Sequence, residues 1–139
     1  LGLGSCVGVC VRDKTKNIGA MVHVMLPDSS GNIGPKPGKY ADSGIDLIYS
    51  ELLKIGASAS NLEAKIAGGA AMFGTSSQTM DIGKRNIEAV KLKLKQKGVR
   101  IIAEDVGGNR ARSIEFNIST GELMVKKVGG GEKVELYNI

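Results

Sequence analysis

Histidine, cysteine and aromatic residues are scarce in this chain, and each shortage excludes a class of function. The 139 residues include one histidine, two cysteines and no tryptophan, and aromatic residues make up only 4%. With one histidine and no C-x-x-C pair, the sequence has no zinc-binding pattern, and we expect neither a metal nor another cofactor. Single-stranded nucleic acids are commonly bound by stacking on aromatic side chains, so the shortage of aromatics argues against that class. No apolar run approaches the ~20 residues of a membrane-spanning helix, so we expect no membrane insertion.

The two cysteines, Cys6 and Cys10, lie four positions apart in one strand-like segment. Residues at that spacing on a strand are roughly 13 Å apart, which is too far for a disulfide bond. We therefore expect two free thiols and a cytoplasmic protein. The remaining composition, 42% hydrophobic and 24% charged residues, is typical of a single globular domain over residues 1–139. Because the chain begins at Leu1 within a strand-like pattern, we also expect a strand upstream of residue 1.

Cys6 and the only histidine, His23, are predicted to lie on the two strands of one hairpin. Residues 6–12 have valine at every second position, which places Cys6 on the face opposite the valines. Residues 18–26 form a second apolar run, and the polar cluster 13–17 between the runs is typical of a turn. A four-residue loop at the start of that cluster pairs positions whose numbers sum to 29, and Cys6 then faces His23 directly.

This pairing predicts Cys6 as a nucleophile and His23 as its base, because a thiol becomes strongly nucleophilic once a base takes its proton. The N–H groups of Gly4 and Ser5 are candidates to hold an oxyanion, since the nearby glycines let the backbone approach a substrate closely. In the alternative interpretation, Cys6 is a small buried hydrophobe and His23 has a structural role. The catalytic interpretation depends on the register, since a shift of one residue would place Val24 opposite Cys6.

The order of the predicted elements indicates an α/β fold, a mostly antiparallel layered sandwich with two helices packed on one face. Apolar spacing predicts helices at 42–55 and 82–97. The strands predicted after the hairpin are 62–67, 99–104, 114–119 and 122–128, with a further edge strand after residue 131. Segment 27–38, with three prolines and three glycines, is a loop that either forms the rim of the site or only connects two elements.

Positive charge gathers at 84–100, where seven basic residues accompany one acidic residue, Glu88, in a chain of net charge +5. This segment is either a solvated helix face or a surface that attracts an acidic partner. Arg110 and Arg112 follow a glycine pair and are candidates to bind phosphate, although the P-loop spacing is absent. Phe73 ends a loop of small residues and is either part of the core or an exposed anchor for a partner.

Five sequence blocks together carry a resemblance to a known family. They are Leu3-Gly4-Ser5-Cys6-Val7, Met21-Val22-His23-Val24-Met25-Leu26-Pro27, Gly68-Gly69-Ala70 through Met72-Phe73, Ile82-Gly83-Lys84-Arg85-Asn86, and Gly107-Gly108-Asn109-Arg110-Ala111-Arg112. In this order they resemble the signature segments of the chemoreceptor glutamine deamidases, the CheD family of bacterial chemotaxis. The likeness runs over most of the chain, and it is strongest to the thermophile-type members that partner the CheC phosphatase.

The resemblance implies an α/β sandwich with a cysteine–histidine site, distantly similar to that of the cytotoxic necrotizing factor toxins. It implies Cys6 as the nucleophile and His23 as the base. The family's third group is a threonine at a position that would precede Leu1, so the group that orients His23 stays unassigned. The family's G-G-A-x-M-F loop is associated with CheC docking, which favours the anchor interpretation of Phe73.

The activity implied by the resemblance is that of a protein-glutamine glutaminase, which converts specific glutamines on the cytoplasmic helices of chemoreceptors to glutamates. A glutamyl methylesterase side activity and regulation of, or by, the CheC phosphatase are also implied. Two other functions stay open. One is a non-catalytic regulatory partner of CheC, and the other is a phosphate- or nucleic-acid-binding domain that uses 84–100 together with Arg110 and Arg112.

Overall fold

Alternating valines determine the centre of the fold. In the computed structural model, the three valines of β2 (Val7–Asp13) are at most 2% exposed. β2 is an inner strand of a four-stranded sheet in the order β3-β2-β4-β5. It pairs antiparallel with β3 (Ile18–Val24) and with β4 (Leu62–Gly68), and β4 pairs parallel with β5 (Arg100–Val106).

A second, antiparallel sheet packs on one face of the first sheet. Its strands, in the spatial order β1-β6-β7-β8, are β1 (Gly2–Leu3), β6 (Ala111–Phe116), β7 (Leu123–Val128) and β8 (Glu135–Asn138). The residues buried between the two sheets form one core cluster: Leu3, Cys10, Ala67, Leu123 and Val125. Cys10 therefore points between the sheets, on the face of β2 opposite the valines.

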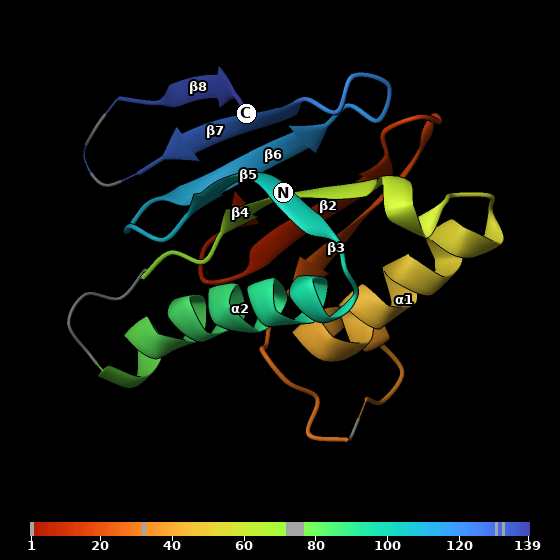
Figure 1. The fold of residues 1–139 in the computed structure, drawn as a ribbon. Helices are drawn as coiled ribbons and strands as arrows, with labels where there is room; N and C mark the ends of the chain where they lie inside the picture. The colour runs from red at the N-terminus through yellow and green to blue at the C-terminus, as the bar shows by residue number, and fades with distance from the viewer. Residues whose placement is uncertain (1, 32, 72–76, 130, 132) are drawn as a thin grey trace.

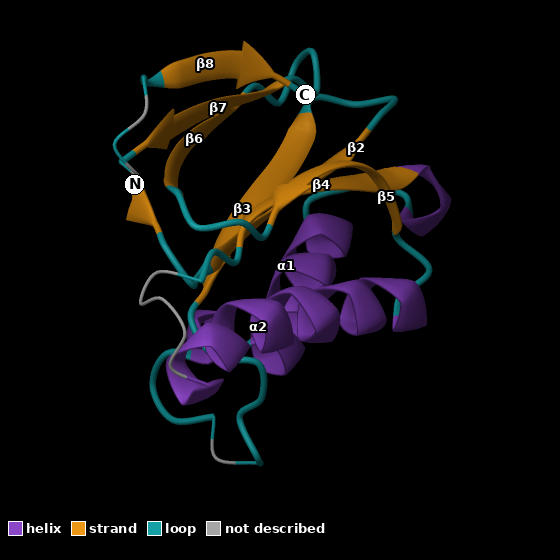
Figure 2. Cartoon of the chain, turned by 90° about the vertical axis from the view of Figure 1, so that its left-hand side faces the viewer, coloured by secondary structure: helices purple, strands orange, loops and turns teal. Residues whose placement is uncertain are grey.

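Two helices cover the other face of the first sheet, so that the molecule has three layers (Figures 1 and 2). They are α1 (Ala41–Lys54) and α2 (Ser77–Gln96). Their buried apolar residues share one core with the valines of β2: Ile45, Ile48, Leu52, Val90 and Leu94. This arrangement confirms the predicted α/β sandwich with both helices on one face, although α2 begins five residues earlier than the sequence pattern predicted.

The structure describes residues 2–31, 33–71, 77–129, 131 and 133–139, with the backbone alone for 77–81. Phe73 lies outside these residues, so both interpretations of it stay predictions. No helix of the described part is long and apolar enough to span a membrane.

The predicted register of the β2–β3 hairpin is wrong by two residues. Asp13 pairs with Ile18, so paired numbers sum to 31 and the turn takes residues 14–17. The physical reason is that Asp13 stays in the strand. Its carboxylate is fully buried and accepts a 2.8 Å hydrogen bond from the N–H of Ser58, which lies just before β4. The turn therefore starts one residue later than the polar cluster suggested.

This correction changes which residue lies opposite His23. The direct partner of His23 is Gly8, not Cys6. A shift of two residues keeps every strand side chain on its predicted face, so His23 stays on the side of the first sheet that Gly8 and Cys10 share. Cys6 packs against the cluster between the two sheets, which lies on that same side. Cys6 comes directly before Val7, the first paired residue of β2, so continuing the register by one position makes Cys6 and His23 diagonal neighbours, a relation in which Cα atoms are about 7–8 Å apart.

Candidate active site

Cys6 lies in the turn that carries the chain from β1 in the second sheet to β2 in the first. All three carbonyl groups of this turn accept a hydrogen bond from another part of the chain. The N–H groups of Ala70 and Gly69 donate to the carbonyl oxygens of Gly4 and Cys6, each at 2.8 Å. The carbonyl oxygen of Ser5 accepts a 3.0 Å bond from a side-chain amide of α2. These bonds hold the backbone of the turn in one conformation.

Gly68, at the end of β4, is needed for this close approach. Its φ is +111°, in the region that favours glycine, and a Cβ at this position would collide with the carbonyl oxygen of Cys6. The neighbouring Gly69 also has a positive φ, and a Cβ there would collide with Ile87 of α2. The glycine pair thus lets β4 and α2 close around the turn that carries Cys6.

The N–H groups of the Cys6 turn are not used in the same way. None of the hydrogen bonds among the described residues has the N–H of Gly4, Ser5 or Cys6 as its donor. Within the part of the chain that the structure describes, the turn therefore uses its carbonyl groups for folding and leaves three backbone donors next to the thiol. Backbone N–H groups beside a nucleophile are a common way to stabilise an oxyanion.

His23 lies on β3, which is an edge strand of the first sheet. Its side chain is half-buried, and Nε2 is buried without a hydrogen-bond partner in the part of the chain that the structure describes. Gly8, opposite His23, is covered from the second sheet, because a Cβ there would approach Ile114 Cδ1 to 2.6 Å and Leu3 Cδ1 to 3.2 Å. The imidazole therefore stands beside an apolar patch between the sheets.

Cys6 and His23 are brought to the same face but are not hydrogen-bonded to each other. Among the described side-chain hydrogen bonds, none joins Sγ of Cys6 to a ring nitrogen of His23. Catalytic hydrogen bonds are often long or poorly aligned before substrate binds, so the lack of this bond does not argue against a catalytic pair. Both side chains are half-buried, and neither is sealed beneath the core.

Burial shifts both ionisation equilibria toward the neutral forms. It raises the pKa of the Cys6 thiol and lowers the pKa of the His23 imidazole, because a charge is less well solvated beside the apolar patch. A neutral thiol then stands near a neutral imidazole at neutral pH. This arrangement suits a base that removes a proton during the reaction, rather than a preformed thiolate.

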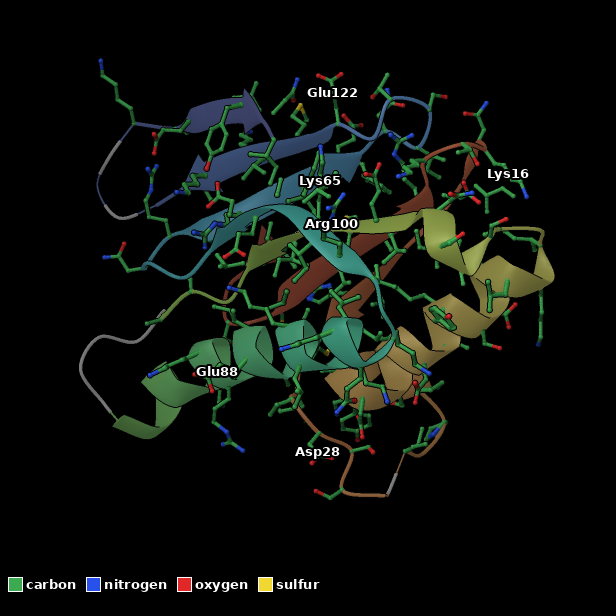
Figure 3. The ribbon with its side chains drawn as sticks, in the orientation of Figure 1. Lys16, Asp28, Lys65, Glu88, Arg100 and Glu122 are labelled. Atoms are coloured by element: carbon green, nitrogen blue, oxygen red, sulfur yellow. The ribbon has the colours of Figure 1, made fainter. Side chains whose placement is uncertain are left out.

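Cys10 is a different kind of thiol. It is 0% exposed, and its burial between the sheets raises its pKa to about 12, an effect that the charge of Lys65 only partly offsets. Figure 3 shows Lys65 directed from β4 toward the second sheet, where Nζ donates a 2.6 Å hydrogen bond to the carbonyl oxygen of Ile139. Cys10 is therefore a core residue without access to a substrate.

Asn86 of α2 is a site residue that the sequence did not single out. Its side chain is 0% exposed, and Nδ2 donates two 3.0 Å hydrogen bonds, one to the carbonyl oxygen of Ser5 and one to that of Met25. Ser5 precedes Cys6, and Met25 follows His23 by two residues. Asn86 belongs to one of the five family-like blocks, but nothing in the local pattern indicated that a polar helix residue would be buried there.

The loop after β3 contributes to the rim of the site. A cavity of about 410 Å³ lies beside His23, and Lys36, Gly38 and Lys39 line it from the loop side. This supports the rim interpretation of segment 27–38 over that of a simple connector.

Arg110 and Arg112, considered above as phosphate ligands, are structural. They are 7% and 2% exposed. Arg112 donates to Asp105 of β5 at 3.1 and 3.2 Å and to the carbonyl oxygen of Gly68, which fastens the second sheet to the end of β4. Arg110 is ion-paired with Glu135 of β8.

The basic segment 84–100 is also partly neutralised. Lys93 and Lys97 both pair with Asp46 of α1, at 3.1 and 2.8 Å, and Lys91 pairs with Glu104 at 3.0 Å. Figure 3 places Glu88 on α2 and Arg100 at the start of β5.

Among the described residues, no group of three or more His, Cys, Asp or Glu side chains is arranged to hold a metal ion.

Comparison with known proteins agrees with the resemblance seen in the sequence. The family model described as CheD chemotactic sensory transduction matches residues 25–127. The chain is 60% identical, over its whole length and 87% of the relative's, to the chemoreceptor glutamine deamidase CheD of Thermotoga maritima. It is 50% identical to the protein of the same name from Halalkalibacterium halodurans, over 95% of this chain and 84% of that protein.

A third relative extends the same pattern. The chain is 46% identical to a probable chemoreceptor glutamine deamidase CheD of Desulfitobacterium hafniense, over 96% of this chain and 84% of the relative. The family match spans more than half of the chain, and the relatives align with nearly all of it. The chain therefore belongs to the CheD family.

Proposed function

We propose that this chain is a cytoplasmic chemoreceptor glutamine deamidase in which Cys6 is the nucleophile and His23 is the general base. The observation that carries the proposal is the placement of the only histidine and an accessible cysteine on one face of the first sheet, in a chain of the CheD family. The names of its relatives supply the substrate class, the glutamine side chains of chemoreceptors.

In the first half of the reaction, His23 takes the proton from Cys6, and the thiolate attacks the amide carbon of a glutamine side chain. The N–H groups of Gly4 and Ser5 donate to the oxyanion that forms. The protonated His23 then gives its proton to the amide nitrogen, the carbon–nitrogen bond breaks, and ammonia leaves. The product of this half is a thioester between Cys6 and the receptor side chain.

In the second half, His23 removes a proton from water, and the resulting hydroxide attacks the thioester carbon. The carbon–sulfur bond breaks, the protonated His23 returns its proton to the leaving thiolate so that the thiol of Cys6 is regenerated, and glutamate remains on the receptor. A glutamyl methyl ester presents the same carbonyl carbon with methanol as the leaving group, so we expect a methylesterase side activity.

The test is peptide mass mapping of a chemoreceptor cytoplasmic fragment after incubation with the protein. Conversion of glutamine to glutamate should occur with the unmodified chain and vanish with Cys6→Ala. Cys10→Ala is the matched control, because it removes a thiol from the same strand and should keep the activity. Loss of turnover in Cys10→Ala but not in Cys6→Ala would refute the assignment. Ammonia release from free glutamine alone would indicate a glutaminase of small molecules instead.

The partnership with the CheC phosphatase belongs to the same proposal, with Phe73 as its anchor. A protein that acts only as a regulator would keep CheC binding and every signalling effect in Cys6→Ala. We expect Phe73→Ala to lose CheC binding while Cys6→Ala loses only deamidation. The two variants thus separate the catalytic function from the regulatory one.

A further inference from the structure

Two methionines flank His23 on the exposed face of β3. Since side chains alternate along a strand, Met21, His23 and Met25 lie on the same face. Met21 is 44% exposed and Met25 is 45% exposed, although both are large apolar side chains. Single exposed apolar residues are common, but these two lie on either side of the candidate catalytic base, where a substrate approaches it.

The opposite wall of the cavity is formed by the end of the loop after β3. Lys36, Gly38 and Lys39 line it, and this wall is fixed to the strand. The N–H groups of Met25 and Leu26 donate to the carbonyl oxygen of Lys39 at 2.8 and 3.1 Å. We call this cavity, bounded by Met21, His23, Met25, Lys36 and Lys39, the Met–Lys groove.

The two lysines of the groove have no ion-pair partner among the residues that the structure describes. Both are exposed, and among the described residues neither has a carboxylate within ion-pair distance. The Nζ of Lys39 lies 5.9 Å from the ring centre of Tyr40, which leaves its charge unbalanced. This differs from Lys93 and Lys97 of α2, which share Asp46.

We infer that the Met–Lys groove binds an acidic, amphipathic helical segment, and that this segment is the part of the receptor that carries the target glutamine. The inference rests on the proposed function and names the feature of the substrate that is recognised. Methionine side chains are flexible and polarisable, so they accept apolar residues from a helix without a rigid pocket. The lysines attract carboxylates on the same helix face, three or four positions from the glutamine.

The first test separates recognition from chemistry. The double variant Lys36→Glu/Lys39→Glu should raise the KM for the receptor fragment about 10-fold and leave kcat within about twofold, because the reversed charges repel the substrate without touching the reacting atoms. The control is Lys14→Glu/Lys95→Glu, two exposed lysines at the β2–β3 turn and on α2. Each pair of substitutions changes the net charge by four, from +5 to +1, so a general charge effect would appear in both.

The second test addresses the apolar part of the groove. Met21→Gln/Met25→Gln keeps the side-chain length and removes the thioethers, and it should raise the KM about fivefold. The lysine-dependent part of the binding should weaken as salt is added, whereas the methionine-dependent part should not. An equal KM for the unmodified protein and Lys36→Glu/Lys39→Glu, at low salt, overturns the inference.

Binding measured on a Cys6→Ala protein, which lacks the proposed nucleophile, tests recognition by the groove independently of the proposed deamidase activity. A labelled acidic receptor peptide, locked as a helix by a side-chain staple, should bind this protein and lose about 10-fold in affinity with Lys36→Glu/Lys39→Glu. If no glutamine is deamidated but this binding pattern holds, the proposed function is wrong, and the groove is a binding site for an acidic helix that carries no target glutamine. If the same sequence with a central proline binds equally well, the groove takes an extended chain along β3, and the helical occupant is wrong.

Discussion

Asn86 and Ser5, which are 81 positions apart in the chain, are joined by a 3.0 Å hydrogen bond from side-chain amide to backbone carbonyl. The same amide group donates its other hydrogen to the carbonyl oxygen of Met25, also at 3.0 Å. One buried side chain on α2 therefore holds both the turn that carries Cys6 and the end of the strand that carries His23. This makes Asn86 a positioning residue, which acts through the two candidate catalytic groups.

Replacing Asn86 by Ala should reduce kcat at least about 10-fold with little change in KM, because Cys6 and His23 lose their common support. The two carbonyl groups also lose their partner, so the free energy of unfolding should fall by about 2 kcal/mol. The measurements are receptor deamidation and urea unfolding. The rate of Cys6 alkylation as a function of pH should also change, since it reports the surroundings of the thiol.

The control for this prediction is Leu52→Ala, on the other helix. Leu52 is 1% exposed in the helix–sheet core, so its removal should cost about 2–5 kcal/mol of stability. It should leave kcat and the alkylation profile of Cys6 unchanged. If Leu52→Ala and Asn86→Ala lower kcat equally, Asn86 has only a structural role.

A comparison of two glycines tests how closely β4 must approach the Cys6 turn. Gly68 and Gly98 both have positive φ, but a Cβ on Gly68 would collide with the carbonyl oxygen of Cys6, whereas Gly98 has open space. Gly98→Ala should cost about 1 kcal/mol of stability and keep full activity. Gly68→Ala should displace the turn and reduce kcat at least about 10-fold. Equal activity in the two variants would mean that the position of the turn does not limit the reaction.

The pH dependence of turnover should reflect a neutral thiol and a neutral imidazole. Because burial lowers the pKa of His23, kcat/KM should fall on the acid side only below the ordinary pKa of histidine, when the imidazole becomes protonated. Because burial raises the pKa of Cys6, alkylation by iodoacetamide in the absence of substrate should accelerate only above the ordinary pKa of a thiol. His23→Gln should lower kcat about 100-fold or more. Rapid alkylation of Cys6 at neutral pH would instead indicate a preformed thiolate.

The layers of the fold could be predicted from the sequence because each depends on a local pattern. The alternating valines of β2 and the helical spacing of Ile45, Ile48 and Leu52 each determine which face is buried, and burial then selects the sandwich. The face shared by Cys6 and His23 followed from the same alternation. The prediction of a shared face holds despite the wrong register, because an error of two positions does not change the face on which a side chain lies.

The details of the site could not be predicted, because they depend on partners far along the chain. Nothing near Asn86 indicates that its amide reaches Ser5 and Met25. From the sequence, Arg112 is a candidate phosphate ligand. In the fold its guanidinium donates instead to Asp105 and to the carbonyl oxygen of Gly68. These contacts form only when the two sheets and α2 come together.

Asp13 offers a test of the interaction that determines the hairpin register. Its carboxylate accepts hydrogen bonds from the N–H of Ser58 at 2.8 Å and from the N–H and Oγ1 of Thr15 at 2.8 and 2.7 Å. These bonds, chiefly the one from Ser58, lower the pKa of Asp13 to about 2. In the unfolded chain the pKa of an aspartate is about 3.9. The folded state therefore favours the carboxylate, and its contribution to stability is complete above the unfolded value and is lost as the pH falls toward 2.

Asp13→Asn keeps the shape of the side chain and removes the charge, so it should be less stable than the unmodified protein at neutral pH. The difference between the two urea midpoints should shrink as the pH falls from about 4 to about 2, because the aspartate becomes protonated over that range. Cys6 alkylation under native conditions should be the same in both proteins, since Asp13 lies at the opposite end of β2 from Cys6. A difference in midpoint that stays constant with pH would show that the hydrogen bonds of Asp13 do not depend on its charge. The buried acceptor would then determine the register by its shape alone.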